Sequence, residues 1–201
     1  MLTGTLQEAG LYLGDVITKS PFNKKGNREN KMLWAANDQV LRQNGGAWDN
    51  PVEHPDWDDR SRELRDHYLE QFVDSDLWGF KDPRTVLTLH GWLEVITNFQ
   101  LIGIYRHPFL VAQSLKKRQK MPYEKSLQLW LEYNWRMQFY HKEYNMPMIE
   151  FHHDPAKLLV QINNLVDFLE LPNKKEKYDF FDMELRNLCL LYTSPSPRDR
   201  G

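Results

Sequence analysis

Three short, mainly apolar runs, each ended by polar residues and a proline, constrain the fold of this chain more than any other feature. The runs LWGF, LIGIY and MIEF are followed by KDPR, RHP and HHDP. Short apolar runs that are bounded in this way are typical of buried strands. Stretches with helical spacing lie around them, and strands that alternate with helices favour a parallel sheet with helices on its faces. The sequence therefore predicts an α/β fold.

Several stretches have the periodicity of amphipathic helices. Gly10 can end the first, and the glycine pair at 45–46 can end the second, because glycine accepts the left-handed conformation found at many helix ends. Asp154 is a good N-cap for the last helix, and Pro155 suits its first helical position. The predicted helices are 1–10, 27–46, 58–73, 108–119, 123–144 and 157–169.

Composition and charge exclude several classes of protein. The chain has 201 residues, of which 41% are hydrophobic, so it is long enough for one globular domain. Its net charge of −2 argues against a general binder of nucleic acid or of membrane surfaces. No run of about 18 apolar residues and no signal segment is present, so we expect a cytoplasmic protein without a membrane partner. The lone Cys189 excludes an internal disulfide framework and a CxxC metal site.

The C-terminal segment CLLYTSPSPRDRG, residues 189–201, differs in texture from the rest of the chain. It has no apolar period and ends in a cluster of Ser, Pro, Arg and Asp residues. It also resembles the translated text of a sequencing adapter, so we expect a non-native tail. The alternative is a natural flexible tail. We therefore expect one domain over residues 1–188.

An arginine at the end of the LIGIY run suggests an anion site. Arg106 can offer two parallel donors to a phosphate, and Pro108 presets a helix whose free N–H groups favour an anion. Ser114 can add a hydroxyl donor if that helix packs beside the same pocket. The alternative is a buried pair of arginine and carboxylate together with an ordinary helix serine.

The KDPR sequence places two further cations, Lys81 and Arg84, at the end of another predicted strand. Asp82 is expected to pair with one of them. In open α/β sheets, ligands bind beyond the carboxyl ends of the strands, so these cations and Arg106 suit a ligand with several anionic groups. The alternative is a structural turn built on Asp82 and Pro83.

Together these motifs resemble the sulfotransferase family, in a bacterial-type branch. The resemblance rests on WGFKDPR, LIGIYRHPFLVAQSLKKR, LWLEYN and MIEFHHDPAKLL followed by VDFLELP, and it covers residues 1–172. It implies an α/β fold like that of P-loop NTPases, with a parallel sheet flanked by helices. It also implies 3′-phosphoadenosine 5′-phosphosulfate (PAPS) as co-substrate and a hydroxyl-bearing acceptor, which could be a glycan, lipid, peptide or small molecule.

The resemblance also implies roles for particular residues. Arg106 and Ser114 match the pair that grips the 3′-phosphate of the donor. Lys81 matches the lysine that neutralises charge near the leaving group, an electrostatic role. Arg84 would orient Asp82 or touch the donor.

The acceptor hydroxyl needs a general base, and no metal is required by this chemistry. Glu29 is the first candidate and Asp15 the second. The alternative is that both are ordinary acidic residues at a helix start or a turn.

One element of the family pattern is missing from the sequence. Family members open with a strand, normally central in the sheet, and a glycine-rich loop that cradles the 5′-phosphosulfate. Here the first predicted helix begins at Met1. We therefore expect a fragment that lacks the first strand and is inactive on its own. A non-catalytic protein of the same fold that binds an anionic nucleotide or glycan is the alternative. A P-loop kinase is disfavoured because no GxxxxGK[ST] motif appears.

Overall fold

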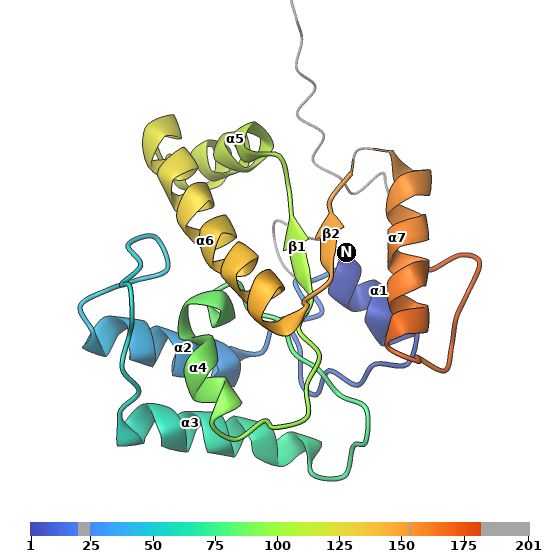
Figure 1. The fold of residues 1–201 in the computed structure, drawn as a ribbon, viewed down its shortest axis with the longest axis horizontal. Coiled ribbons are helices and arrows are strands. Elements are labelled where there is room, and N and C mark those ends of the chain that lie inside the picture. Colours follow the sequence, from blue (N-terminus) through green and yellow to red (C-terminus); the bar gives the residue numbers. More distant parts are fainter. Residues whose placement is uncertain (20–24, 153, 182–201) are drawn as a thin grey trace, which may run out of the picture.

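The computed structural model of the protein describes residues 1–19, 25–152 and 154–181. The predicted non-native tail, residues 189–201, lies outside the described residues. The described chain combines helices with a two-stranded parallel sheet, and helices flank the sheet (Figure 1). The structure agrees with the α/β class at this level.

The elements follow the predicted order closely. Their bounds are α1 Leu2–Glu8, α2 Lys31–Gln43, α3 Asp59–Leu69, the 3-10 helix η1 Glu70–Phe72, α4 Thr85–Leu93, β1 Gly103–Tyr105, α5 Pro108–Gln119, α6 Tyr123–Tyr144, β2 Met148–Glu150 and α7 Pro155–Phe168. Helix α4 has no counterpart among the predicted helices.

Side-chain caps and glycines set several of these bounds. The Asn30 side chain accepts hydrogen bonds from the N–H groups of Met32 (2.7 Å) and Leu33 (3.4 Å), which starts α2. Asp154 caps α7 by accepting from the N–H of Ala156 at 2.9 Å, so the predicted cap is confirmed. Gly45 follows α2 with a φ of 75°, a conformation that costs glycine little.

Strands β1 and β2 pair in parallel, with Ile104 opposite Ile149. Helix α6 lies beside β1, and α7 covers β2 on the other side (Figure 1). Ile149 belongs to an apolar cluster of α1 and α7 residues that includes Leu6, Ile162 and Val166. Burial of this cluster holds the sheet against the two helices.

A second apolar cluster joins α2, α3 and α4. Its centre is Trp92, which is fully buried and meets the ring of Tyr68 edge to face at 5.8 Å. Leu33 and Val40 contribute the buried face of α2, as the helical spacing predicted. This cluster supports the segment that carries the KDPR sequence.

The prediction of a strand at residues 77–80 needs correction. In the described structure it forms one parallel bridge, between Trp78 and Tyr12, and does not join the sheet of β1 and β2. Gly10 (φ 112°) and Gly14 (φ 62°) lie on either side of Tyr12. These left-handed conformations interrupt the extended backbone that a longer ladder would need.

Candidate functional site

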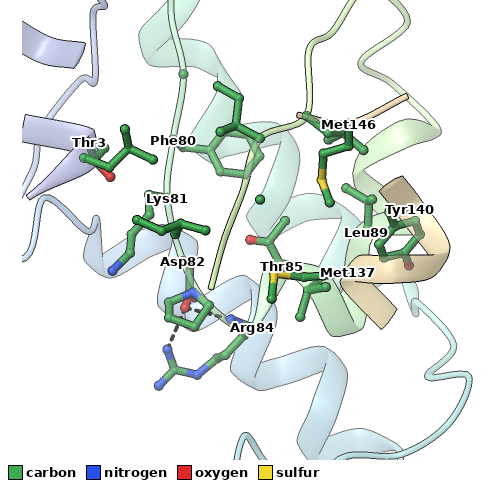
Figure 2. Close-up of a pocket in the computed structure, with 18 of the residues that line it drawn as sticks. Thr3, Phe80, Lys81, Asp82, Arg84, Thr85, Leu89, Met137, Tyr140 and Met146 are labelled. Atoms are coloured by element: carbon green, nitrogen blue, oxygen red, sulfur yellow. Dashed lines mark hydrogen bonds and ion pairs between the residues drawn. The ribbon is translucent and has the colours of Figure 1, made fainter. Parts of the chain in front are cut away.

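One cavity of about 1240 Å³ is lined by residues from several elements of the fold. Its walls come from residues 76–86 and 101–106, from α4 and α6, and from the start of α1 (Figure 2). Four of the predicted site residues line this cavity, namely Glu29, Lys81, Arg84 and Arg106.

The structure places Lys81 and Glu29 in direct contact. The Lys81 ammonium group forms an ion pair with Oε1 of Glu29, and the indole N–H of Trp34 donates to Oε2 at 3.0 Å. The Glu29 carboxylate is buried, whereas 38% of the Lys81 side chain is exposed. Glu29 therefore balances the charge of Lys81 in this conformation, and both of its oxygens have partners.

Arg84 is held by two carboxylates. Its Nη1 donates to Oδ1 of Asp82 at 3.0 Å, and its Nε lies 2.7 Å from Oδ1 of Asp38 in an ion pair without hydrogen-bond geometry. The guanidinium group also lies over the ring of Trp34, 5.6 Å from its centroid. The predicted pairing of Asp82 with a neighbouring cation is confirmed, and the partner is Arg84 (Figure 2).

Asp82 also orders the turn that carries the two cations. Its side chain accepts from the N–H of Arg84 at 3.1 Å, and its carbonyl accepts from the N–H of Thr85 at 3.0 Å. Burial raises the pKa of Asp82, although the Arg84 guanidinium and a hydrogen bond from Asn37 both favour the ionised form. The structural interpretation of this turn and the anion-binding one are therefore compatible, because the same contacts fix Arg84 at the cavity wall.

Arg106 follows β1 and lies in the cavity wall, as its place after the strand predicts. Its carbonyl accepts the indole N–H of Trp130 at 2.8 Å, and its guanidinium lies 5.4 Å from the ring centroid of Phe151. The same arginine lines a second, smaller groove of about 460 Å³ beside α6. Arg106 thus stands between two open spaces.

Two predicted site residues are not among the residues that line the cavity. Ser114 is partly buried in α5, and its carbonyl accepts from Nε of Arg118 at 3.5 Å. Asp15 is exposed, and its N–H donates to the Gln71 side chain at 3.0 Å. The shared phosphate of Arg106 and Ser114 stays a prediction, as does the catalytic use of Asp15.

Sequence reasoning missed the residues of α2 that hold this site. Asn37, Asp38 and Trp34 all contact the KDPR turn or Glu29. One signal was available, since Asn37 is an amide on the face of α2 that also carries Leu33 and Leu41. Arg118, the last residue of the basic run at the end of α5, is a further cation in the cavity wall.

The cavity also lies between two edges of extended backbone. Gly103 donates to the Pro147 carbonyl, and the Tyr105 carbonyl accepts from Phe151, so Gly103 and Tyr105 point their backbone groups at β2. The N–H and C=O of Ile104 therefore point away from β2. Ile104 lines the cavity.

The opposite edge has the same character. The N–H of Tyr12 donates to the carbonyl of Leu77 at 3.1 Å, and the N–H of Gly79 donates to the carbonyl of Tyr12 at 2.9 Å. The N–H and C=O of Trp78, which lies between Leu77 and Gly79, therefore point away from Tyr12. Trp78 also lines the cavity. The backbone groups of Ile104 thus point away from β2, and those of Trp78 point away from Tyr12. Both residues line the same cavity.

Within residues 1–19, 25–152 and 154–181, no group of three or more His, Cys, Asp or Glu side chains is arranged to hold a metal ion. None of the helices in that part of the chain has the length and apolar character needed to cross a bilayer.

Comparison of the chain with known proteins gave no matching family model, no significant match among curated proteins and none among solved structures.

Proposed function

We propose that the protein is a sulfotransferase that moves a sulfuryl group from PAPS to an acceptor hydroxyl. The observation that supports this most strongly is the gathering of Lys81, Arg84 and Arg106 in the wall of one cavity. PAPS carries a 3′-phosphate, a 5′-phosphate and a sulfuryl group, and such a ligand needs several cations at separate points. The motif resemblance supplies the reaction type.

In the proposed reaction, an acceptor oxygen forms a bond to sulfur while the bond from sulfur to the 5′-phosphate oxygen breaks. Negative charge develops on the departing phosphate oxygen, and the Lys81 ammonium group neutralises it. Arg106 binds the 3′-phosphate through two parallel N–H donors. The acceptor proton passes to a carboxylate, for which Glu29 is the better candidate because Glu29 lines the cavity with Lys81.

Glu29 acts as a base in this scheme only after it separates from Lys81. The anionic donor attracts Lys81, and this competition releases a Glu29 oxygen toward the acceptor. Binding of the donor would therefore activate the base, so that the Glu29 carboxylate is free to accept a proton only when PAPS is bound. Asp15 is less suitable, because it is exposed and lies outside the cavity lining.

The second candidate is a non-catalytic protein that binds an anionic nucleotide or glycan. The ion pair between Lys81 and the buried Glu29 favours it, because both carboxylate oxygens already have partners and neither is open to an acceptor hydroxyl. The two candidates differ in one outcome. Both bind the nucleotide, and only the enzyme transfers sulfuryl from PAPS.

The P-loop-like form of the fold is part of the same proposal. In that fold a further strand lies between the segment at 77–80 and β1 and leads into a phosphate-binding loop. The outward backbone groups of Trp78 and Ile104, which border the same cavity, support a strand in this place. Such a strand would pair with both edges and give hydrogen-bond partners to the backbone groups of Trp78 and Ile104.

Calorimetry with 3′-phosphoadenosine 5′-phosphate (PAP), the product-like nucleotide, tests the proposal. Arg106→Ala is expected to weaken PAP binding by about 1.5–3 kcal/mol, roughly 10- to 150-fold, for a lost set of charged hydrogen bonds. Arg60→Ala, an exposed arginine of α3, is the matched control and should bind as the unchanged protein does. Equal affinity in Arg106→Ala would show that this arginine is structural. If the unchanged protein does not bind PAP, the proposed use of PAPS as co-substrate is refuted.

A further inference from the structure

Asn37 occupies an unusual place for an amide. It is fully buried on the apolar face of α2 and does not line the cavity. Its Nδ2 donates to Oδ2 of Asp82 at 3.0 Å and to Oγ1 of Thr85 at 3.2 Å. Its Oδ1 accepts from Oγ1 of Thr88 at 2.7 Å and from the indole N–H of Trp92 at 3.0 Å. All four hydrogen-bonding positions of the amide are used.

The partners also fix which way the amide points. The indole N–H of Trp92 can only donate, so the atom that faces it is the amide oxygen. The ionised carboxylate of Asp82 can only accept, so the atom that faces it is the amide nitrogen. An aspartate at position 37 would present an acceptor to an acceptor, and a leucine would present neither. The position therefore selects an amide.

We propose that Asn37 is a positioning residue for the anion site, which holds Asp82 so that Asp82 presents Arg84 to the cavity. Asn37 engages Oδ2 of Asp82, and this leaves Oδ1 for the backbone N–H and the guanidinium of Arg84. The Asp82 carboxylate has no exposed surface, so these neighbours replace its lost hydration. The inference rests on the proposed function, in which Arg84 faces the anionic donor.

The chain offers a control that separates positioning from stability alone. Thr88 donates to the oxygen of the same Asn37 amide, on the side away from Asp82, and is also fully buried. Thr88→Val removes that bond and the longer contact of the same hydroxyl with the Arg84 carbonyl (3.4 Å), and it retains the volume of the side chain. It should lower the unfolding temperature without changing Asp82 or the affinity for PAP. Asn37→Leu should lower stability and change both.

The decisive measurement is the titration of the Asp82 carboxyl by carbon-13 NMR in the complete chain. Asn37→Leu is expected to raise the Asp82 pKa, since a hydrogen bond to the ionised form is lost, and Thr88→Val is expected to leave it unchanged. PAP affinity should fall about tenfold in Asn37→Leu. The inference is overturned if Asp82 titrates equally in Asn37→Leu and the unchanged protein, or if Thr88→Val shifts it as much.

A second variant covers the case in which Asn37→Leu does not fold. Asn37→Asp has nearly the same shape, and its protonated carboxyl can donate to Asp82. Burial and the like charge of Asp82 raise its folded pKa above the unfolded value. The loss of stability relative to the unchanged protein should therefore be small at low pH and grow as pH rises. A pH-independent loss would refute the contact with ionised Asp82. If the unchanged protein does not bind PAP, the proposed function fails, and the titrations still decide the role of Asn37.

Discussion

Replacement of Glu29 by glutamine separates the two candidate functions. Glutamine keeps the shape of the side chain, and its carbonyl oxygen can still accept the indole N–H of Trp34, which is 3.0 Å from the Glu29 carboxylate. The ion pair with Lys81 is lost. Lys81 is then free to meet an anionic ligand without giving up a carboxylate partner.

The expected gain in affinity can be worked from simple electrostatics. A unit charge about 8 Å from a phosphate contributes about 0.5 kcal/mol in a water-like medium and about 2 kcal/mol at an effective dielectric constant of 20. The removed charge is that of Glu29, whose side chain is 9% exposed, while its partner Lys81 is 38% exposed, so a value between these limits, about 0.7–1.4 kcal/mol, applies. We expect Glu29→Gln to lower the Kd for PAP by about three- to tenfold. The enzyme hypothesis adds that sulfuryl transfer falls by about 10²- to 10⁴-fold, as expected for a lost general base.

Calorimetry with PAP and a transfer assay with PAPS and hydroxyl acceptors, both on the full-length protein, measure the two effects. Asp49→Asn is the matched control, because Asp49 forms a surface ion pair with Lys125 (3.3 Å) and does not line the cavity. Unchanged or weaker PAP binding in Glu29→Gln would refute the competition between Glu29 and the donor for Lys81. Tighter binding with transfer unchanged would exclude Glu29 as the base. Tighter PAP binding in a protein that never transfers sulfuryl would favour the non-catalytic binder.

Two further outcomes test the sheet and one of the ion pairs. Hydrogen exchange should be faster at the Ile104 amide than at the Tyr105 amide, because only Tyr105 points its N–H at β2, and equal protection would contradict the open edge. Hydrogen bonds from Arg62, with lesser contributions from Arg65, lower the pKa of Glu94 to about 2. A depressed folded pKa contributes stability above about pH 4.5 that is lost as pH falls toward 2. Acid titration of the unfolding temperature should show this loss in the unchanged protein and a smaller one in Glu94→Gln.

The helices after the strands were the most predictable part of the fold. Helices α5 and α6 have the bounds that the sequence predicted, residues 108–119 and 123–144. Pro108 fixes the start of α5, and Asn145 ends α6 in the left-handed conformation (φ 50°). These signals are local, so sequence alone carries them.

Strand pairing was less predictable, because it depends on segments that are distant in the sequence. The run at 77–80 has the apolar texture of a strand, but its described partner is Tyr12, between two glycines with positive φ. The apolar composition of a segment indicates how much apolar surface it can bury, and it does not indicate with which strand the segment pairs. The expectation of a third strand in one continuous sheet therefore went beyond the local signal.

The candidate site likewise has a part that the sequence predicted and a part that it did not. The cations after the apolar runs were predicted, since a strand end delivers the next side chain to the edge of the structure. Their partners Glu29 and Asp38 come from the segment that starts α2 and from α2 itself, more than forty residues before Arg84. No spacing rule links those positions, and only the folded structure brings them together.

Helical geometry indicates how Ser114 can reach the phosphate assigned to Arg106. At about 100° per residue, Ser114 lies about 60° around α5 from Val111 and about 40° from Arg118, two residues that line the cavity. Ser114 thus borders the face of α5 that meets the cavity, and a modest roll of the helix would bring its hydroxyl to a bound phosphate. Ser114→Ala should then weaken PAP binding by about 0.5–1.5 kcal/mol, less than Arg106→Ala, because a neutral donor is lost. Calorimetry on both variants measures the difference. If Ser114→Ala binds PAP as tightly as the unchanged protein, α5 does not roll and Arg106 holds the phosphate without this serine.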